Sequence, residues 1–431
     1  MNIHKLEKYK LYKVILVSSF SNNARNLAAL ATLAATTAFA QSSVTIYGQA
    51  DAAYTSAKSG ANSVTGIFGA GRGSNFVGFM GTEDLGGGWK ANFKLEAGYN
   101  LDNGAGASSN ANNQATGGLT TQSGAATAPQ LNGATTPSTD RASLGGAQGL
   151  TFNRWSYVGL SNANMGEIRV GREYTPAFQA VLAADVVGSN GAGNSLNMTL
   201  MISGQSANAV ATAASASNGI SYESPSLSGF KAKVQMFQGE NPNTGTATTL
   251  NTAKNGDGTS YHLSYAAGKI SAGLGATASK STAVVGTTTG LGLPGKYDLT
   301  TAYARYDFGV ALATIGQATE KQAGSAATAS EMKNSSMILG VSVPLGAYKL
   351  NANYITSKYT VAGAETGKAT QLAIQGLYAM SKRTDLYATY AVTDNSVGNA
   401  YGLGNGAGRM VAVNGADAKS TAFQVGVRHA F

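Results

Sequence analysis

The sequence contains no cysteine and only 7 prolines, 3 histidines and 2 tryptophans in 431 residues. Because cysteine is absent, the chain cannot form a disulfide framework or a thiol-based site, so its stability must come from backbone pairing and packing. Charged residues are also few, at 12 %, and they are scattered along the chain. A nucleic-acid-binding protein needs a clustered basic face instead, so we expect no nucleic-acid partner.

The few histidines argue against a metal site or an enzyme. His4, His262 and His429 stand alone in the sequence, and the HExxH spacing of zinc sites is absent. A barrel protease or lipase is therefore a distant alternative, because its catalytic constellation has no suitable histidine. The glycine-rich stretch 402–408 resembles a phosphate-binding loop, but no helical pattern follows it, and flexibility explains its glycines better. We expect no cofactor, no metal and no catalytic activity.

Long apolar runs are missing except near the N-terminus. Residues 1–40 begin with a lysine-rich head, continue as LAALATLAATTAFA and end in Ala38-Phe39-Ala40, a cleavage site of the A-x-A type. The run is short for a transmembrane helix of ~20 residues, so we predict a secretory signal peptide that is cleaved after Ala40. Its removal takes away five Lys/Arg and one Glu, which lowers the net charge from +9 to +5. Residues 41–431 show no composition break and are predicted to form a single domain.

The remaining chain has features of a β-structure with one apolar and one polar face. The sequence holds 56 glycines and 20 tyrosines, and its mean hydropathy is −0.07. Many segments alternate apolar and polar residues with a period of two, which is typical of strands. In residues 89–99 the apolar set is Ala91, Phe93, Leu95, Ala97 and Tyr99, and the opposite set is Lys90, Asn92, Lys94, Glu96 and Gly98. Aromatic residues near strand ends favour a membrane barrel over a solvated sandwich.

The connections between these segments fall into two length classes. Seven are tight turns, at 83–89, 162–166, 224–229, 266–269, 306–309, 344–348 and 381–385. Eight are longer and polar, near 56–73, 100–151, 175–217, 239–258, 280–296, 318–333, 359–369 and 394–419. The two classes alternate strictly, so the sequence predicts an all-β fold, a sixteen-stranded antiparallel transmembrane β-barrel with short periplasmic turns and long external loops. A propeller or solenoid would show a near-constant repeat instead.

The chain is organised around residues 152–187, where two alternating strands and a tight turn lead into a long loop. The first strand has Trp155 and Tyr157 on one face and Arg154 and Ser156 on the other. After Thr175-Pro176 the alternation stops, because proline cannot donate to a ladder. No charged residue occurs from 186 to 217. A loop of this length is usually functional or disordered.

Six segments carry a specific pattern: SVTIYGQADAAY, GFMGTEDLGGGWKANFKLEAGY, FNRWSYVGLSNANMGEIRVGREYTP, ISYESPSLSGFKAKV, YAMSKRTDLYATYAV and FQVGVRHAF. Together they resemble the general diffusion porins of Gram-negative bacteria, in particular the betaproteobacterial porins of the Burkholderia and Bordetella kind. The resemblance implies a homotrimer in the outer membrane and a third loop, at about 175–217, that folds inward as a constriction. It also implies that Phe431 is presented to the barrel-assembly machinery. Outer-membrane lipid and lipopolysaccharide are the expected surroundings.

The resemblance also indicates which side chains line the constriction. Arg154 occupies the position of a wall arginine in the family's narrow zone, and its parity puts it on the lumen side. The other candidates for the pore constriction are Arg72, Arg169 and Asp185, whereas Arg172 and Glu173 are expected to anchor the third loop or to contact a neighbouring subunit. Several basic positions of the family are uncharged here, namely Gln49, Phe76, Met80 and Ser215. The incomplete set of arginines predicts a modest preference for anions.

Two classes of function remain open from the sequence. The favoured one is a water-filled channel for the passive diffusion of small hydrophilic solutes and ions. The alternative is an outer-membrane adhesin or structural barrel that acts through its long surface loops. Ion conductance in a planar bilayer distinguishes the two, because only the channel conducts.

Overall fold

The computed structural model describes residues 43–106, 150–188, 190–202, 213–239, 256–283, 293–324, 331–398, 401–404, 410, 413 and 418–431. The predicted signal peptide lies outside these residues. Large parts of the predicted connections 100–151, 239–258 and 394–419 also lie outside them. The fold and the site below are built from the described residues.

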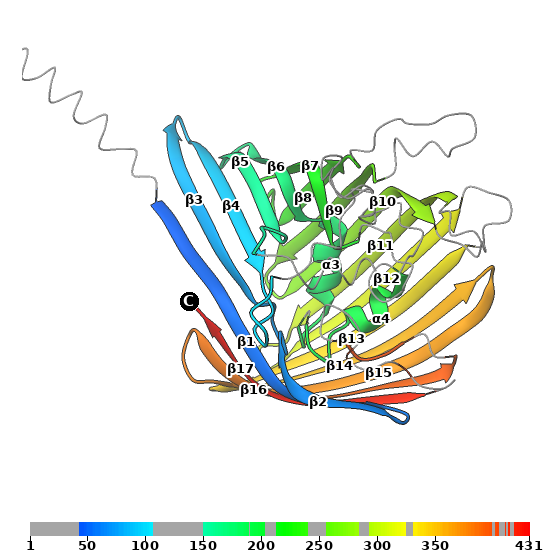
Figure 1. Ribbon diagram of the computed structural model, residues 1–431. Helices are drawn as coiled ribbons and strands as arrows, with labels where there is room; N and C mark the ends of the chain where they lie inside the picture. Colours follow the sequence, from blue (N-terminus) through cyan, green and yellow to red (C-terminus); the bar gives the residue numbers. More distant parts are fainter. Residues whose placement is uncertain are drawn as a thin grey trace, which may run out of the picture.

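The strands form one antiparallel sheet that closes on itself as a barrel (Figure 1). They are β1 (Ser43–Ser59), β2 (Asn62–Gly69), β3 (Phe76–Gly86), β4 (Trp89–Gly98), β5 (Trp155–Asn162), β6 (Gly166–Tyr174), β7 (Ser215–Glu223), β8 (Phe230–Phe237), β9 (Gly258–Ala267), β10 (Ile270–Ala283), β11 (Leu293–Asp307), β12 (Leu312–Gly324), β13 (Met332–Leu345), β14 (Tyr348–Val361), β15 (Ala364–Ala379), β16 (Thr384–Val397) and β17 (Lys419–Ala430). From β3 onward each strand pairs with its neighbours in sequence, β1 pairs with both β2 and β3, and β1 also pairs with β17, which closes the barrel.

The strands β2 and β3 together occupy one position in the barrel. β1 pairs with β3 from Ser43 to Gln49 and with β2 from Ala52 to Ser59, so the two strands lie end to end along the same neighbour. The barrel therefore has the sixteen strand positions that the alternation of connections predicts.

Residues 70–75 interrupt the ladder between β2 and β3. Ala70 has a φ of 59°, in the left-handed region, which turns the chain out of the strand. The carboxylate of Asp51 accepts hydrogen bonds from the backbone N–H groups of Arg72 and Gly73, at 3.0 and 2.6 Å. Because Asp51 is on the inner face of β1, these bonds hold the interruption on the lumen side and carry Arg72 into the lumen.

Two of the predicted long connections, 56–73 and 359–369, are wrong. β1 continues to Ser59 and pairs with β2 around a turn at residues 60–61. Similarly, β14 and β15 are joined by Ala362-Gly363, both with positive φ, at 51° and 79°. In both segments short polar and small side chains continue the ladder, since backbone pairing and not side-chain polarity decides where a strand ends. The seven predicted tight turns are confirmed by the strand pairing.

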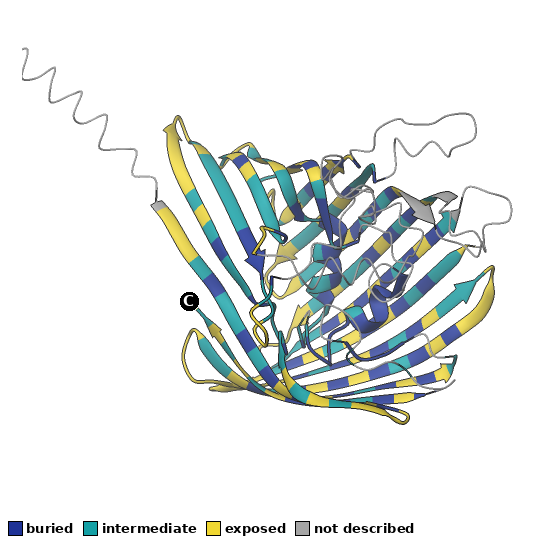
Figure 2. Ribbon diagram, viewed as in Figure 1, coloured by how far each residue is buried: buried dark blue, intermediate teal, exposed yellow. Residues whose placement is uncertain are grey.

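Exposed and buried residues alternate along many strands (Figure 2), as expected when successive side chains point to opposite faces of the barrel wall. Outward residues such as Val158, Ile168 and Val170 are apolar and are 60 %, 46 % and 52 % exposed. Inward residues such as Gln371 and Thr389 are polar and buried. An apolar exterior and a polar interior are the arrangement of a membrane barrel. Neither helix among the described residues is long and apolar enough to cross a membrane.

The third connection folds into the barrel. It contains α3 (Pro176–Ala184) and α4 (Leu196–Thr199), which pack on strands β8 to β14 from the inside (Figure 1). The main apolar cores lie between this connection and the wall. One core joins Ala177, Phe178, Leu200 and Ile202 to Tyr297 and Leu299, and another joins Ala184, Met198 and Met201 to Ile338, Ile355 and Tyr401. We call residues 175–188 and 190–202 the inner loop.

Helix α3 begins at the residues where the strand alternation stops. The hydroxyl of Thr175 accepts a hydrogen bond from Phe178 N at 3.3 Å as the N-cap, and it donates to Ala213 O at 2.5 Å. Pro176 takes the first helical position, where a missing N–H does no harm. The sequence that follows, PAFQAVLAA, is rich in good helix formers.

β1 and the end of the C-terminal strand meet at one seam. Phe431 N donates to Gly48 O at 3.0 Å, and Gly48 N donates to Phe431 O at 3.1 Å. The phenyl ring of Phe431 covers Gly48 so closely that a Cβ there would lie 2.4 Å from the ring. The last residue of the chain thus takes part directly in closing the barrel.

Candidate functional site

Polar side chains of the wall hold the inner loop in place. Each of the following binds backbone of the inner loop: Ser260 to Ala177 N at 3.1 Å, Thr314 to Ala184 O at 2.9 Å, Asn334 to Met198 O at 2.9 Å, Gln371 to Asn194 O at 2.9 Å and Gln424 to Ala192 N at 2.8 Å. These contacts come from β9, β12, β13, β15 and β17. The inner loop therefore covers one side of the lumen wall, and the strands β4 to β8 bring their charged side chains to the other side.

Asp185 organises the inner loop itself. Its Oδ1 accepts hydrogen bonds from Val187 N at 2.8 Å, Gly188 N at 3.0 Å and Asn353 Nδ2 at 2.6 Å, and its Oδ2 accepts one from Ser195 N at 2.7 Å. Burial raises the pKa of Asp185 above its usual value, although the bonds from Ser195, Gly188 and Asn353 act in the opposite direction. The carboxylate of Asp185 therefore accepts four hydrogen bonds from the loop backbone and Asn353, and its place in the pore lining stays a prediction.

Nine charged side chains lie along the inner face of β4 to β8 in two ion-paired groups, which meet at the ring of Trp155, and we call them the wall cluster. Its basic members are Lys94, Arg154, Arg169, Lys231 and Lys233, and its acidic members are Glu96, Glu167, Glu173 and Glu223. Five basic and four acidic groups leave a surplus of one positive charge.

Glu96 forms the end of the wall cluster nearest β1. Its two carboxylate oxygens bind Lys94 Nζ at 2.9 Å and Arg154 Nε at 3.1 Å. Tyr47 OH donates to the same carboxylate at 2.7 Å. The guanidinium of Arg154 also lies over the ring of Phe76, 5.0 Å from its centroid. Arg154 is thereby fixed in the lumen next to the start of the inner loop.

The prediction that Arg154 and Ser156 share the lumenal face of one strand is wrong, although the side chain of Arg154 does lie in the lumen. β5 begins at Trp155, and Trp155 and Tyr157 face the lumen while Val158 faces outward. Arg154 precedes the strand, in an irregular segment that does not follow the alternation. Its side chain reaches Glu96 because it is free of the strand geometry. Arg154 and Ser156 therefore do not share a lumenal face.

Arg169 lies at the centre of the other end of the wall cluster. Its guanidinium contacts Glu167 at 2.5 Å, Glu223 at 3.2 Å and Glu173 at 3.3 Å. Lys231 Nζ also pairs with Glu223. Arg169 is one of the residues predicted to line the pore. The three carboxylates around it largely compensate its charge.

Glu173 is the most buried carboxylate of this group. It accepts hydrogen bonds from Lys233 Nζ at 2.6 Å and from the hydroxyl of Ser221. The side chains of Glu173 and Lys233 are only 3 % and 4 % exposed. Because a buried charge is tolerated only with a partner, this pair links β6 to β8 below the point where the inner loop begins.

In most ion pairs of the wall cluster the basic side chain is more exposed than its acidic partner. Lys94 is 25 % exposed and its partner Glu96 is 4 % exposed, and Lys231 is 48 % exposed against 21 % for Glu223. The pairs of Arg169 with Glu167 and with Glu223 are the exceptions, with 15 % for the arginine and 21 % for either glutamate. The water in the lumen therefore meets more ammonium and guanidinium than carboxylate surface.

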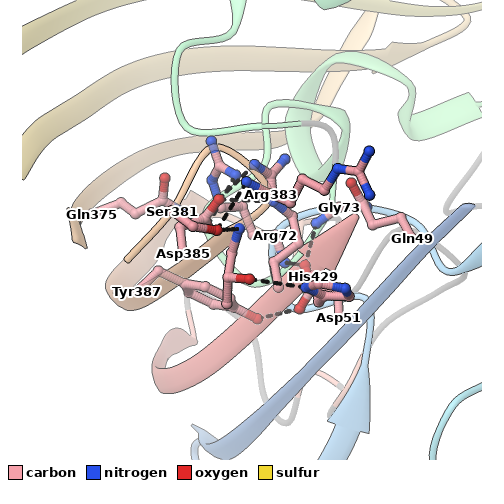
Figure 3. Close-up of polar contacts among 12 residues, drawn as sticks. Gln49, Asp51, Arg72, Gly73, Gln375, Ser381, Arg383, Asp385, Tyr387 and His429 are labelled. Atoms are coloured by element: carbon pink, nitrogen blue, oxygen red, sulfur yellow. Dashed lines mark hydrogen bonds and ion pairs between the residues drawn. The ribbon is translucent and has the colours of Figure 1, made fainter. Parts of the chain in front are cut away.

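Arg72 belongs to a second charged group, which spans the seam between β1 and β17 (Figure 3). Its Nη1 is 3.4 Å from Asp385 Oδ1, and Arg428 Nη2 is 2.5 Å from Asp385 Oδ2. Tyr387 OH donates to Asp51 Oδ1 at 2.5 Å, which completes the contact between β16 and the interruption in front of β3. Two arginines and two aspartates balance here, so this group adds no net charge.

Arg172 links the segment before β5 to strand β7, next to the start of the inner loop. Its Nε donates to Asn153 O at 2.6 Å, and its Nη1 donates to Ser217 Oγ at 2.8 Å. These bonds connect Asn153, two residues before β5, with Ser217 of β7, just beside the start of the inner loop. The contacts lie within one chain.

From the sequence, Lys94, Lys231 and Lys233 could be either solvated strand residues or part of the ion path, and Glu96, Glu223, Asp385 and Arg428 were not identified as their partners. Their parity was the available signal, because each alternates with outward apolar residues such as Val234 and Val427. Alternation identifies the face but not the height or the partner, so the ion pairs could not be assigned. No group of three or more potential metal ligands occurs in the described part of the chain.

Known proteins resemble this chain over nearly its whole length. Residues 27–399 match the model of a Gram-negative porin family. Outer membrane porin protein 32 of Delftia acidovorans is 31 % identical over 405 residues, which cover 92 % of this chain and 97 % of that protein. The anion-selective porin from Comamonas acidovorans has a similar structure, with a TM-score of 0.68, 29 % identity and coverage of 91 % and 100 % of the two chains.

A more distant structure supports the fold alone. OmpT of Vibrio cholerae, an outer membrane protein, matches with a TM-score of 0.60 at 14 % identity over 90 % of this chain and 98 % of that chain. The closed barrel, the polar lumen with its inner loop and the matches over most of the length agree with one another. The chain belongs to the Gram-negative porin family and is an outer-membrane porin.

Proposed function

We propose that the lumen passes small hydrophilic solutes and ions with a modest preference for anions, and that the inner loop and the wall cluster form its narrow zone. The observation that carries the proposal is the bias of exposure in the wall cluster. Its lysines present more surface to the lumen than the carboxylates that they pair with. The described residues of the inner loop hold one ionisable group, Asp185, which is engaged within the loop.

The greater exposure of the basic side chains affects a passing ion only at short range. Fixed charges act on a passing ion within about one Debye length, ~8 Å at physiological salt, so the lining of the narrow zone decides selectivity. The surplus of one positive charge supports a modest preference. The related Comamonas protein is described as anion-selective, which supports the same sign here.

Further assignments belong to the same proposal. Arg172 and Glu173 anchor the start of the inner loop, in keeping with the bonds of Arg172 to Asn153 O and Ser217 Oγ. Residues 1–40 are a cleaved signal peptide, and residues 41–431 are the mature barrel. The mature protein is a homotrimer that is delivered to the barrel-assembly machinery through its C-terminal strand and Phe431. The protein is not an enzyme.

Planar-bilayer recording tests the central claim. Purified protein should give stepwise conductance, and reversal potentials in a tenfold KCl gradient should show a preference for chloride. A protein that inserts but does not conduct would contradict the channel. A preference for potassium would contradict the role of the wall cluster and leave the channel itself intact.

A further inference from the structure

Aromatic side chains line the lumen beside the wall cluster. They are Tyr47 of β1, Phe76 of β3, and Trp155 and Tyr157 of β5, and we call them the aromatic strip. All four residues are partly exposed. The ring centroids of Tyr47 and Phe76 are 5.8 Å apart, and those of Trp155 and Tyr157 are 5.9 Å apart. The strip thus consists of two pairs of rings in edge-to-face contact.

Two basic side chains lie where the two pairs of rings meet. Nζ of Lys94 is 4.5 Å from the ring centroid of Trp155 and 5.7 Å from that of Tyr47. The guanidinium carbon of Arg154 is 5.0 Å from the ring centroid of Phe76. These distances are within the range of cation–π attraction, so the cations and the rings form one surface.

The surplus positive charge of the wall cluster is located at this surface. Lys94 and Arg154 share one carboxylate, Glu96, at 2.9 and 3.1 Å, and neither has another ion pair among the described residues. Glu96 is only 4 % exposed, whereas Lys94 is 25 % exposed. The other members of the wall cluster balance, since three basic groups pair with three acidic ones: Arg169, Lys231 and Lys233 with Glu167, Glu173 and Glu223.

The inner loop presents an uncharged surface to the lumen. Helix α3 buries one face against the wall, with Ala177, Phe178, Ala180, Val181 and Ala184. Its unburied positions are Gln179, Leu182 and Ala183. Phe178 also contacts the ring of Tyr174, which in turn contacts Trp155, at 5.3 and 5.1 Å between centroids. The inner loop therefore supports the aromatic strip at one end and adds no charge of its own there.

An aromatic carboxylate matches this combination of groups. Aromatic rings attract one another in edge-to-face and offset arrangements, in addition to the effect of the apolar area that they bury. A carboxylate forms strong hydrogen bonds with ammonium and guanidinium groups. Chloride can use only the cations, and an uncharged aromatic solute can use only the rings.

We propose that the lumen binds aromatic carboxylates, with the ring of the solute against Trp155 and Tyr157 and its carboxylate at Lys94 and Arg154. Lys94 lies directly opposite Tyr157 in the pairing of β4 and β5, so a cation and a ring are adjacent at this position. The inference names a class of solute for the channel proposed above and rests on that function.

Block of the chloride current in planar bilayers tests the proposal in the wild type. Benzoate should half-block the current at a concentration about fivefold lower than cyclohexanecarboxylate does, since only benzoate gains the ring contacts. The two anions have the same charge and similar size. Cyclohexanecarboxylate has the more apolar ring, so hydrophobic binding alone would give the opposite order. Uncharged benzamide should block more weakly than benzoate.

A pair of variants locates the site. Trp155→Leu/Tyr157→Leu should raise the half-blocking concentration of benzoate about fivefold and change that of cyclohexanecarboxylate less than twofold, because leucine keeps an apolar surface but no ring. The matched control is Trp89→Leu, which replaces the other tryptophan of the chain, at the start of β4, and should change neither value more than twofold. Stepwise conductance in KCl verifies that each variant is folded.

Fluorescence gives a measurement that needs no conductance. In Trp89→Leu the single remaining tryptophan is Trp155, so its emission reports on the aromatic strip. The aromatic quencher 4-nitrobenzoate should quench it saturably, with half-saturation at the concentration that half-blocks the current. Its uncharged amide, 4-nitrobenzamide, should quench only in linear proportion to its concentration, by collision.

Three results would overturn the proposal: equal block of the wild type by benzoate and cyclohexanecarboxylate, an unchanged block by benzoate in Trp155→Leu/Tyr157→Leu, or equal saturable quenching by 4-nitrobenzoate and its amide. Failure of the proposed selectivity is a separate result. A preference for potassium would refute it without changing the ratio of benzoate to cyclohexanecarboxylate, because the two anions carry the same charge. A barrel that does not conduct would refute the channel, and the fluorescence titration would still decide whether the aromatic strip binds the solute.

Discussion

Removing two charges from the narrow zone should reverse the selectivity of the channel. The double variant Lys94→Gln/Arg154→Gln changes the wall cluster from a surplus of one positive charge to a surplus of one negative charge. Glu96 keeps a hydrogen bond from Tyr47 OH at 2.7 Å, and glutamine can donate to it at either position. The barrel should therefore fold, and only the electrostatics of the lining should change.

The magnitude follows from the distance between the lining and the ion. Two unit charges roughly 8 Å from the path of an ion change its energy in water by about 1 kcal/mol, and screening over one Debye length leaves about 0.4 kcal/mol. The change has opposite signs for chloride and potassium. The permeability ratio of chloride to potassium should therefore fall about fourfold, since 1.4 kcal/mol corresponds to a factor of ten.

Reversal potentials in a tenfold KCl gradient measure this ratio directly. In ~1 M salt, where the Debye length is ~3 Å, the difference between variant and wild type should shrink to less than about 1.5-fold. The control Lys58→Gln/Lys419→Gln removes the same charge from exposed outward positions and should have no effect. If the double variant keeps the wild-type reversal potential, or if the control shifts it equally, then the wall cluster does not line the narrow zone.

Three further predictions concern stability, closure and processing. Glu173→Gln leaves Lys233 buried without its carboxylate, so the free energy of unfolding in urea should fall by about 3 kcal/mol, whereas Glu167→Gln, at a more exposed position, should cost less than about 1 kcal/mol. Gly48→Ala places a Cβ 2.4 Å from the ring of Phe431 and should lower the yield of folded barrel in heat-modifiability gels; Gly376→Ala, with nothing within 4 Å, should not. Intact mass of the protein from outer membranes should correspond to a chain that begins at Gln41, and a species that retains Met1 would exclude cleavage after Ala40.

The barrel could be predicted from the sequence because the patterns that indicate strands and turns each lie within a short segment. Alternation in segments such as 89–99 gives the strand and its faces, and turn residues separate the strands. The same rule failed where the chain leaves the ladder. Arg154 lies one residue before β5, and Arg72 lies in the interruption 70–75, so parity could not place either side chain.

The site was less predictable because it depends on pairing across distant strands. In the sequence Asp185 is an isolated carboxylate in a loop. In the structure it accepts hydrogen bonds from Ser195 N and Asn353 Nδ2, which hold the inner loop together and attach it to the wall. Lys233 is buried only because Glu173, 60 residues away, comes to lie beside it. No periodicity in a single sequence reports such a contact.

The seam between Gly48 and Phe431 extends the closure of the barrel by one step. β1 and β17 pair from Gln49–Ala430 to Ser59–Ser420, and the two reciprocal hydrogen bonds between Gly48 and Phe431 continue this ladder. Without them Gly48 would keep two unpaired backbone groups at an edge of the sheet, and free edges pair readily with other chains. The seam therefore also protects the barrel against association through its edges.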